Sequence, residues 1–487
     1  MKNEYLAFDL GASSVRTILG RLEDGKLQIS EVNRFYNGIA RMFGHCYWDY
    51  TRLFDSMKKG LQLAWQEGAR PVSLAVDTWG LDFALFTRDN EFCGQPYAYR
   101  DPHTAGMMEK LFEVVPKKRI YELTGIQFMQ INSLVQLFAL VQNHSPQLEI
   151  ARSILMVPDI FNYLFTGVKK AELTFASTTQ FFNPHTRDWA EEILKAIGIS
   201  KDMLPEIVEP GTVLGSLDKD LCGELGITTM PVIAVGSHDT ASAVVSVPTQ
   251  SDDYAYISAG TWCLMGIEEP KPVITAKTME YNFSNEQGVF GTTRLLKNVM
   301  GLWMIQECRR ILLRERNYSF VELVALAQKA KPFKALIDPD YPAFLNPPDM
   351  IESLRDYCQK TTQPVPESVG EFIRVIIEGL ALKFAVIAEQ LREVSANPVN
   401  RIHIIGGGCQ NELLNQFTAN AAGVPVVAGP VEATATGNLL MQAVAMQHIS
   451  TLSEARQIVA ESNNCKRYEP QDRKDWEEAL IRFKEII

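Results

Sequence analysis

The sequence predicts a protein of the α/β class with two domains. Apolar, β-branched runs typical of strands alternate with helical patterns along the whole chain, as in layered α/β folds. A length of 487 residues exceeds the size at which one hydrophobic core stops growing. A strand–turn–strand pattern around a central glycine occurs at 5–22 and again at 252–269, which indicates two related halves. We place the domain boundary near residue 245, between domains 1–244 and 245–487.

The elements of the first half follow from hydrophobic periodicity and from breaks at glycine and proline. Strands are expected over 5–22, around a turn at Gly11, and over 27–36 after the EDGK turn. A helix is expected over 50–68, and 71–87 has the pattern of strand, break and strand. The remaining elements predicted here are helices over 134–144 and 153–167, the second broken or begun by Pro158, and a buried strand that runs into a small-residue helix over 230–247.

The second half repeats the alternation after its first strand pair. Helical spacing predicts a helix over 295–310, and an amphipathic core helix over 371–391. The segment 331–370 is rich in proline and aspartate, which favours an irregular surface insertion or cap. The segment 401–427 has the pattern of strand, glycine-rich turn, helix and strand.

Charge and cysteine usage exclude several classes of protein. The formal net charge is −11 and the calculated pI is about 5.3, which argues against a nucleic acid or an anionic membrane surface as partner. No signal peptide or uncharged membrane-spanning run is visible. The eight cysteines are scattered, without a C-x-x-C pair, which favours buried reduced thiols in a cytoplasmic protein. The histidines do not cluster with them, so no structural zinc site is predicted.

The turn at the start of the chain has the composition of a phosphate-binding loop. Small residues after Gly11 leave successive backbone N–H groups accessible, and the hydroxyls of Ser13 and Ser14 add donors. Arg16 could reach the same phosphate oxygens. A single turn of this kind is more often a plain β-hairpin. The matching turn within 252–269 shifts the balance toward a nucleotide held between the two halves.

A third glycine cluster, Gly406–Gly408, lies between a strand and a helix. The first turn of that helix presents free N–H groups, and glycine lets a ligand approach the backbone. The spacing is not the dinucleotide-binding fingerprint, because Asn411 stands where its last glycine belongs. A P-loop pattern is absent from the sequence as well. A tight strand-to-helix turn with Asn411 near the cap is an equally good interpretation of this segment.

Asp239 is the candidate catalytic residue. It follows an apolar strand and begins a small-residue helix, where a carboxylate can accept a proton from a hydroxyl. An N-cap formed by Ser237 or Asp239 explains the same pattern equally well. His238 could be a base or a metal ligand, although a histidine beside an apolar strand is more often a hydrogen-bonded structural residue.

Other polar positions admit both a functional and a structural interpretation. Asp77 and Trp79 flank a turn at Gly80, and a tryptophan there could be a sugar platform or part of the core. Asn298 and Gln306 fall within the expected 295–310 helix, either as solvated positions or as ligand contacts.

Taken in order, these motifs resemble the FGGY family of carbohydrate kinases over essentially the whole chain. Within the family the resemblance is to members that act on L-rhamnulose. One position departs from the pattern, because Val15 stands where glycine is expected. The motifs that carry the resemblance are D-L-G-A-S-S-x-R at 9–16, D-T-W-G-x-D at 77–82, S-H-D-T-A-S-A at 237–243, S-x-G-T-W-x-L-M-G at 258–266, L-K-N-x-M-G-L-W at 296–303 and G-G-G-C-Q-N at 406–411.

The resemblance implies an actin/hexokinase-like (ribonuclease H-like) ATPase fold whose two domains close around ATP, Mg²⁺ and a ketose. The N-terminal domain would bind the sugar and the C-terminal domain the nucleotide. The implied reaction is ATP-dependent phosphorylation of the 1-hydroxyl of L-rhamnulose to L-rhamnulose 1-phosphate, in L-rhamnose catabolism. The residues that the resemblance assigns are Asp239 as the base, Asp9 near Mg²⁺, Ala12, Ser13, Ser14, Val15, Arg16, Thr261, Gln306 and Gly407 for the nucleotide, and Gly80, His238, Asp239, Thr240 and Asn298 for the sugar.

Two alternatives stay open at this point. A related ketose, such as fuculose or xylulose, could be the substrate, because a few hydroxyl contacts decide the choice of sugar. The chain could also be a nucleotide-binding non-enzyme, such as a sugar sensor or a filament-forming relative of actin. ATP turnover with and without sugar distinguishes these classes. The sequence leaves the oligomeric state, monomer or homodimer, open.

Overall fold

The computed structural model describes residues 3–12 and 14–487, and its chain forms two compact units. Unit 1 comprises Met1–Gln250, Glu268–Leu295 and Ala433–Ser462. Unit 2 comprises Ser251–Ile267, Leu296–Glu432 and Asn463–Ile487. The chain therefore passes into unit 2 after residue 250 and returns to unit 1 twice.

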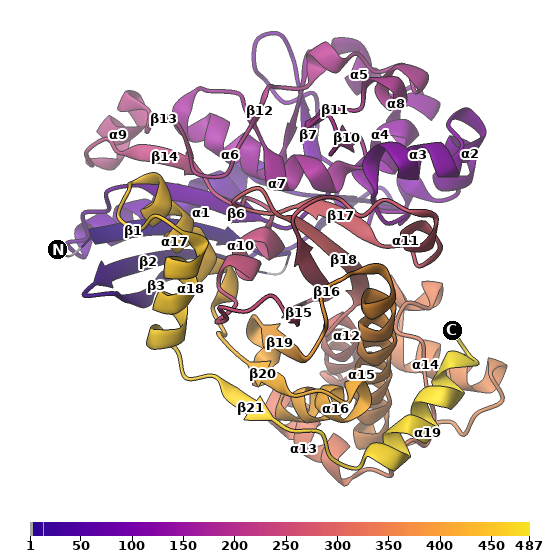
Figure 1. Cartoon of the computed structure of the whole chain (residues 1–487). Helices are drawn as coiled ribbons and strands as arrows, with labels where there is room; N and C mark the ends of the chain where they lie inside the picture. The colour runs from indigo at the N-terminus through magenta and orange to yellow at the C-terminus, as the bar shows by residue number, and fades with distance from the viewer. Residues whose placement is uncertain (1–2, 13) are drawn as a thin grey trace. The chain divides into compact units, whose positions relative to one another are not determined.

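Unit 1 is built on a six-stranded sheet (Figure 1). The first three strands of the chain form consecutive antiparallel hairpins, and the two strands added beside the first run parallel to it. The hairpins follow from the small-residue turn after Leu10 and from the Asp24–Gly25 turn, which permits the positive φ that a tight turn needs. From one edge to the other the strands are β13 (Thr212–Ser216), β14 (Pro231–Ala234), β6 (Leu74–Thr78), β1 (Asn3–Leu10), β2 (Ser14–Glu23) and β3 (Lys26–Tyr36).

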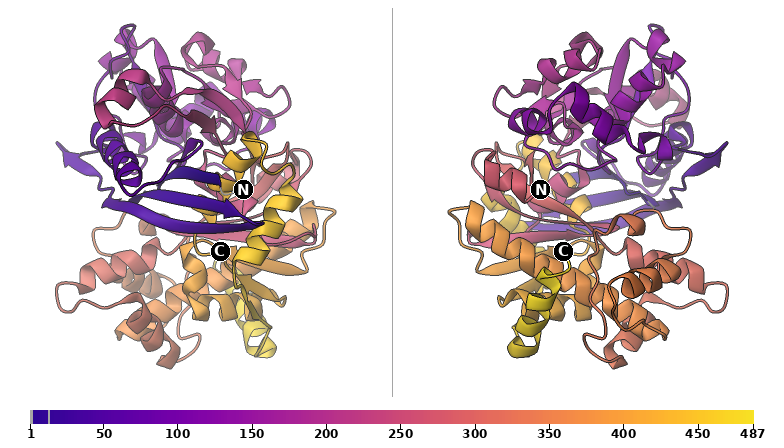
Figure 2. Two further views of the ribbon diagram at one scale, coloured as in Figure 1. Left: turned by 90° about the vertical axis from the view of Figure 1, so that its left-hand side faces the viewer. Right: turned by 90° about the vertical axis from the view of Figure 1, so that its right-hand side faces the viewer.

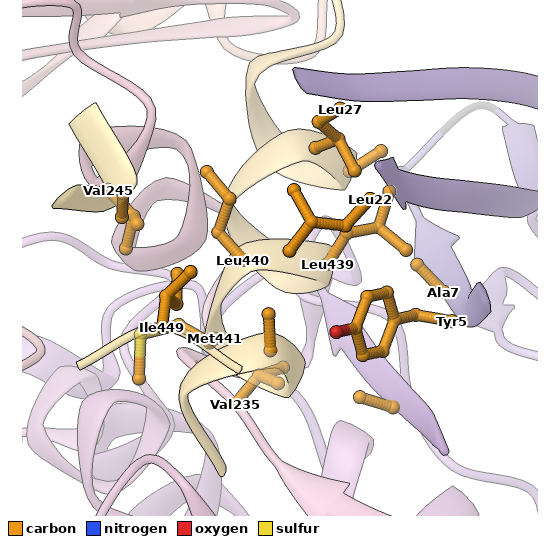
Figure 3. Packing of buried hydrophobic residues seen from close by; sticks show 14 of the residues in the cluster. Tyr5, Ala7, Leu22, Leu27, Val235, Val245, Leu439, Leu440, Met441 and Ile449 are labelled. Carbon is orange, nitrogen blue, oxygen red and sulfur yellow. The ribbon is translucent and has the colours of Figure 1, made fainter. Parts of the chain in front are cut away.

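Helices cover both faces of this sheet. On one face, α17 (Ala433–Ala445) and α18 (Leu452–Ser462) pack on the strands and enclose the cluster of buried side chains in Figure 3, where Leu439 lies beside Tyr5 and Leu22. Figure 2 shows both helices beside the N-terminal strands. On the other face lie α1 (Tyr50–Gln66) and α6 (Val157–Thr166), with Phe8 of β1 stacked on Phe165 of α6 at 5.5 Å. The alternation of side chains along β1 directs its residues to both helical layers.

The segment 153–167, predicted to be helical, is in fact strand followed by helix. Ser153–Met156 forms β8, which pairs with β7 (Phe83–Phe86), and α6 begins only at Val157. Pro158 occupies the first turn of α6, where its missing N–H has no partner to lose. The three apolar residues Ile154–Met156 pair in this strand, and periodicity alone does not tell a short apolar run in a strand from one in a helix.

The other elements of unit 1 connect these strands. They are β4 (Ala40–Met42), β5 (His45–Tyr47), α2 (Met107–Val114), α3 (Lys117–Thr124), α4 (Ser133–Gln142), α5 (Pro146–Ile150), β9 (Ala171–Glu172), α7 (Leu173–Ala176), β10 (Phe182–Asn183), β11 (Asp188–Trp189), α8 (Glu191–Ala196), β12 (Ile207–Val208), α9 (Lys219–Leu225), α10 (Asp239–Val245), α11 (Ala276–Glu280) and β17 (Ser284–Gln287).

The sheet of unit 2 repeats the strand order of the first. From one edge to the other the strands are β17 (Ser284–Gln287), β18 (Thr293–Met300), β16 (Trp262–Glu269), β15 (Tyr254–Ala259), β19 (Arg401–Ile405), β20 (Val426–Ala428) and β21 (Lys466–Tyr468). The strands β18, β16 and β15 lie side by side in reverse order of sequence, as β3, β2 and β1 do, and β19 and β20 are added parallel to β15. This repetition agrees with the two related halves that the sequence indicates.

The longest helix is α15 (Val369–Val394), which spans 26 residues and contains the predicted core helix 371–391. It begins with a capping box between Ser368 and Glu371. Its charged residues Arg374 and Glu378 are buried but paired with each other, with 2.6 Å between Nε and Oε1. The other helices of unit 2 are α12 (Trp303–Leu312), α13 (Phe320–Lys329), α14 (Met350–Lys360), α16 (Glu412–Ala422) and α19 (Arg473–Lys484).

Two predictions for unit 2 are wrong in detail. The expected helix 295–310 is the end of β18 followed by α12, so Asn298 lies on a strand. The chain bends at Gly301, where a Cβ would lie 2.6 Å from the backbone carbon of Trp262 and only glycine fits. The segment 331–370 is not purely irregular either, because it contains α14, whose Leu354 is fully buried.

The sequence predicted neither a membrane-spanning helix nor disulfide bonds. Among the described residues, no helix is both long and apolar enough to cross a membrane. All eight cysteines are free thiols, and seven of them are buried.

The crossing of α10 and α17 depends on Gly437. A Cβ at this position would lie 1.7 Å from the backbone oxygen of Ser242, so one helix has to move. We expect Gly437→Ala to lower the free energy of unfolding by about 1–3 kcal/mol or more, the range for overpacked cores. Urea denaturation followed by circular dichroism measures the change in midpoint.

The matched control is Gly223→Ala in α9, an exposed helical glycine whose added Cβ would meet nothing within 4 Å. Removing a helical glycine there should be neutral or stabilising by up to about 1 kcal/mol. Equal midpoints for the two variants would contradict the close approach at Gly437.

Candidate active site

Three carboxylates gather where the parallel strands of unit 1 end. Asp9 and Asp77 are register partners on β1 and β6, so they lie side by side at the carboxyl edge of the sheet. Asp239 follows β14 on the same edge as the first residue of α10. A bridge between Thr78 and His238, with a hydrogen bond from Thr78 N to Ser237 O of 2.9 Å, ties the β14 loop to β6. Ligand sites in open α/β sheets form at this edge.

Asp239 has the environment of a base. Burial raises the pKa of its carboxyl, His238 opposes that rise, and the negative charge of Asp9 adds to it. The side chain is still 34% exposed, and Thr240 Oγ1 donates a hydrogen bond of 3.1 Å to its Oδ1. The N-cap position belongs to His238, and no side chain caps the helix. The interpretation of this motif as a helix cap is therefore wrong.

Asp77 is a fully buried carboxylate with an unusual deficit of partners. Asn438 of α17 donates a hydrogen bond of 2.6 Å to its Oδ2, whereas its Oδ1 has no hydrogen-bond partner among the described residues. Burial raises the pKa of Asp77 well above its ordinary value, and the neighbouring Asp9 raises it further. A cation at this edge would relieve the repulsion between the two carboxylates.

The oxygen atoms of Asp9 and Asp77 fit Mg²⁺ chemically. Arg16 forms an ion pair with Asp9, so a cation here would compete with or supplement the guanidinium. Among residues 3–12 and 14–487, no group of three or more His, Cys, Asp or Glu side chains could hold a metal. Mg²⁺ does not require such a group, because it retains several waters and takes its other ligands from phosphate oxygens. The residues present therefore fit an ion held mainly by substrate and water.

The imidazole of His238 lies between two carboxylates, one near each ring nitrogen. Its Nδ1 is 3.2 Å from Glu286 Oε2, and its Nε2 is 3.5 Å from Asp239 Oδ1. Gly80 leaves space at the ring, since a Cβ there would lie 3.2 Å from Nε2. Burial raises the pKa of Glu286, but Arg294 and His238 outweigh it, so the pKa is lowered and the carboxylate is ionised at neutral pH.

A buried glutamate fixes the backbone just before Asp239. Glu172 Oε2 accepts a hydrogen bond of 3.1 Å from Ser237 N, and its carboxylate also accepts bonds from Thr174 and Phe175. Burial raises the pKa of Glu172 to about 7, although these donors lower it. The segment that carries His238 and Asp239 is thus anchored to α7 as well as to β6.

The first glycine turn closes on itself as a hairpin turn should. Gly11 N donates to Ser14 O at 2.9 Å, and Asn37 Nδ2 donates to Gly11 O at 2.9 Å. Ala12, Ser14 and Arg16 are partly exposed. Val15 is fully buried in β2, so only its backbone could contact a ligand. Ser13 lies outside the described residues.

Unit 2 brings together Thr261, Gln306 and Gly407 at one end of its sheet. Leu302 N donates to Gly260 O and Trp303 N to Thr261 O, each at 3.1 Å, which places the start of α12 against the β15–β16 turn. Gln306 lies on the first turn of α12. The glycine cluster joins them, because a Cβ at Gly408 would lie 2.8 Å from Ala259 O and 3.0 Å from Leu302.

Gly407 itself has an open approach, since an added Cβ would meet nothing within 4 Å. Asn298, assigned to the sugar on the sequence, lies on β18 in unit 2, whereas Gly80, His238 and Thr240 lie in unit 1.

Trp79 is a core residue and not a sugar platform. It is 4% exposed, its ring lies 4.3 Å from that of Trp48, and both indole N–H groups donate to Asp82. Burial raises the pKa of Asp82 to about 7, although the hydrogen bonds from the two indoles lower it.

Several polar residues of the site were not predicted. All four are buried in the fold, and no local pattern in the sequence distinguished them from polar residues on the surface. These residues are Glu172, Glu286, Arg294 and Asn438.

Full-length relatives share substantial sequence identity with the chain. A protein of Bacteroides thetaiotaomicron named Rhamnulokinase is 45% identical over 487 residues, which is 100% of both chains. A protein of Halalkalibacterium halodurans with the same name is 42% identical over 471 residues, which is 97% of this chain and 100% of the relative.

Solved structures share the fold at low identity. A gluconate kinase from Lactobacillus acidophilus has a TM-score of 0.83 and 16% identity, with 100% of this chain and 98% of that chain covered. A ligand-bound xylulose kinase from the same organism has a TM-score of 0.83 and 17% identity, with 99% and 97% covered. The predicted two-domain α/β fold is therefore confirmed.

Two domain models account for nearly all of the chain between residues 4 and 446. The N-terminal domain model of the FGGY carbohydrate kinases matches residues 4–246, and the C-terminal domain model matches residues 255–446. Together with the full-length relatives, these matches show that the chain belongs to the FGGY family of carbohydrate kinases.

Proposed function

We propose that this protein catalyses the ATP-dependent phosphorylation of the 1-hydroxyl of L-rhamnulose, with L-rhamnulose 1-phosphate and ADP as products, in L-rhamnose catabolism. The observation that carries the proposal is Asp239, a partly exposed carboxylate with a raised pKa, in a chain of a carbohydrate kinase family. The choice of sugar is supported by the name that full-length relatives with 38–45% identity carry.

Asp239 acts as the base in this proposal. A carboxylate whose pKa is raised toward the working pH accepts a hydroxyl proton more readily than an ordinary one. The hydrogen bond from Thr240 orients the carboxylate, and the Glu172 contact holds the preceding backbone. Gly80, His238 and Thr240 contact the sugar, and Asn298 adds a further contact from β18.

The remaining residues neutralise and position the phosphates. Phosphoryl transfer depends mainly on positioning and on electrostatic stabilisation of the transferred group. We assign the backbone of the Gly11–Arg16 turn and the Arg16 guanidinium to the phosphates, and Thr261, Gln306 and Gly407 to ATP. Asp9 and Asp77 would hold Mg²⁺, which when bound neutralises phosphate charge.

The domain assignment and the location complete the proposal. Residues 1–244 would form the sugar-binding domain and 245–487 the nucleotide-binding domain. We place the enzyme in the cytoplasm, in keeping with its eight unpaired cysteines.

The substrate is tested with a coupled ADP-release assay that contains ATP, Mg²⁺ and one of L-rhamnulose, L-fuculose or D-xylulose. We expect the highest kcat/KM for L-rhamnulose, since the site must pair hydroxyl groups that differ between these sugars. A preference for another ketose would replace the substrate and leave a sugar kinase. Absence of sugar-dependent ADP release would overturn the proposed function.

Asp239→Asn tests the base. The amide keeps the shape of the side chain but cannot accept the proton, so kcat should fall by about 10²–10⁴-fold, the usual contribution of a positioned base. ATP binding and the unfolding midpoint should be preserved. Asp55→Asn, an exposed carboxylate on α1, is the matched control and should retain full activity. Near-wild-type turnover of the Asp239 variant would remove this residue from the role.

Thr261→Val tests the nucleotide side. Loss of the hydroxyl removes one donor to phosphate, so the KM for ATP should rise about 10- to 150-fold, as for the loss of one hydrogen bond to a charged group, while the KM for sugar changes less. Thr361→Val is the control, because that hydroxyl bonds to the backbone of α14 and to Gln363, none of which belongs to the proposed site. An unchanged kcat and KM for ATP would contradict the placement of Thr261.

A further inference from the structure

A chain of buried hydrogen bonds connects α17 to a carboxylate of the proposed site. Ser73 Oγ donates to Gln442 Oε1 at 2.7 Å, and Gln442 Nε2 donates to Asn438 Oδ1 at 2.8 Å. Asn438 Nδ2 in turn donates to Asp77 Oδ2 at 2.6 Å. All four residues are 0% exposed. The chain is therefore closed to solvent and ends on Asp77.

A backbone oxygen fixes the direction of each bond in this chain. Gln442 Nε2 also donates to Leu6 O at 3.0 Å, and a carbonyl oxygen can only accept. The amide nitrogen of Gln442 must therefore face Leu6 and Asn438, so Asn438 presents its oxygen to Gln442. Turning the Asn438 amide over would set two N–H donors against each other. Asn438 consequently offers Asp77 a donor.

The helix that carries Asn438 is held closely by two neighbouring elements. A Cβ at Gly437 would lie 1.7 Å from the backbone oxygen of Ser242 in α10, and a Cβ at Gly20 in β2 would lie 2.6 Å from Leu439 Cδ1. Such close packing leaves α17 little freedom to shift against the sheet. The donor of Asn438 thus has a fixed place relative to β6.

The chain occupies only one of the two carboxylate oxygens of Asp77. The other, Oδ1, is buried and has no hydrogen-bond partner among the described residues. Glu172 and Asp82 are also buried in unit 1, and each accepts hydrogen bonds at both carboxylate oxygens. A buried carboxylate oxygen without a partner destabilises a protein. A cation near Asp77 would offset this effect.

Asp77 and Asp9 lie on the same face of the sheet. They are register partners on parallel strands, so their side chains project in the same direction, toward the face that α17 covers. Hydrogen bonds to a carboxylate are shorter and stronger than those between neutral groups. The bond from Asn438 therefore restrains the orientation of Asp77 beside Asp9.

We propose that Asn438 is a positioning residue for Mg²⁺: it holds Asp77 in the orientation in which the charge of this carboxylate supplements that of Asp9 at the cation. The inference deepens the proposed function and rests on it, because it assumes that the protein uses a metal–nucleotide complex. Asn438 acts only through Asp77 and touches neither cation nor phosphate. Helix α17, which the C-terminal domain model covers, thereby supports the carboxylates of unit 1.

The first test measures metal binding without catalysis. Mn²⁺ is the probe, and the electron paramagnetic resonance signal of free Mn²⁺ gives its Kd for the full-length protein with ADP and without sugar. ADP is kept below the protein concentration, so that little of it stays free. We expect Asn438→Leu, which cannot donate, to raise this Kd about 10- to 100-fold, the range for hydrogen-bond partners of metal-binding groups. An unchanged Kd would overturn the proposal.

The second test separates positioning from packing. In the Asp77→Asn background, Asn438→Leu should cause no further loss of Mn²⁺ affinity, because Asn438 acts through that carboxylate. The exchange Asp77→Asn/Asn438→Asp rebuilds a donor–acceptor pair and keeps an acceptor for Gln442, but it moves the charge into α17. We expect its Mn²⁺ affinity to stay as low as that of Asp77→Asn. Wild-type affinity in the exchange variant would show that the pair is only structural.

Asn132→Leu is the matched control. Asn132 is also a buried asparagine, but its Nδ2 donates to Gln127 O at 2.8 Å and not to a carboxylate. It should leave the Kd for Mn²⁺ unchanged even if the unfolding midpoint falls. An equal loss of affinity in both variants would contradict a specific role of Asn438.

A shorter side chain replaces leucine if Asn438→Leu fails to fold. Asn438→Ser adds no bulk, and its hydroxyl is too short to reach Asp77 Oδ2 as the amide does. It should also weaken Mn²⁺ binding, and wild-type affinity in this variant would refute the inference.

The metal measurement also separates this inference from the proposed function. A protein that phosphorylates no ketose but loses Mn²⁺ affinity in Asn438→Leu would refute the substrate and retain the positioning. A protein that phosphorylates L-rhamnulose and keeps its Mn²⁺ affinity in the variant would do the reverse.

Discussion

The parallel pairing of β1, β6 and β14 is the constraint on which the candidate site depends. Parallel strands end at the same edge of a sheet, so residues that are far apart in sequence meet there. Asp9 and Asp77 become neighbours through register alone, and the bridge from Thr78 to His238 brings the start of α10 to the same edge. None of these residues needs a long loop to reach the others.

This arrangement concentrates negative charge, which neighbouring residues stabilise with hydrogen bonds and an ion pair. Asn438 donates to Asp77 from α17, and Arg16 pairs with Asp9 across the first hairpin. Glu172 is buried behind the Asp239 loop, where its carboxylate accepts backbone hydrogen bonds. A buried carboxylate without such donors would be protonated or would destabilise the fold. These contacts hold the acidic groups in place.

The C-terminal return of the chain completes the first sheet. Gln442 of α17 donates to Leu6 O and accepts from Ser73 Oγ, which fastens the helix to β1 and to the residue that precedes β6. The contact of Gly437 with the Ser242 backbone holds α17 against α10, the helix that Asp239 begins. Residues 433–445 thus support the carboxylates Asp9, Asp77 and Asp239, which all lie within the first 250 residues.

Sequence alone determined the class of fold, the repeated halves and the position of most motifs. Alternating apolar patterns and glycine turns are local signals, and they located the first hairpin, the Asp239 helix and the 401–427 segment correctly. Local signals failed at 153–167 and 295–310, because a short apolar run pairs as a strand only where a neighbouring strand is available, and Gly301 ends β18 through a contact with Trp262.

Only the tertiary structure decided which polar residues act together. Asp77 and Asn438 are 361 positions apart, and Glu286 meets His238 only after β17 has folded beside α7. For Trp79 the structure decided against a functional role. Its neighbours in sequence are polar, but the side chain packs in the core against Trp48. Burial and hydrogen bonding between distant segments set the charge and orientation of these groups. Such contacts cannot be inferred from the spacing of residues along the chain.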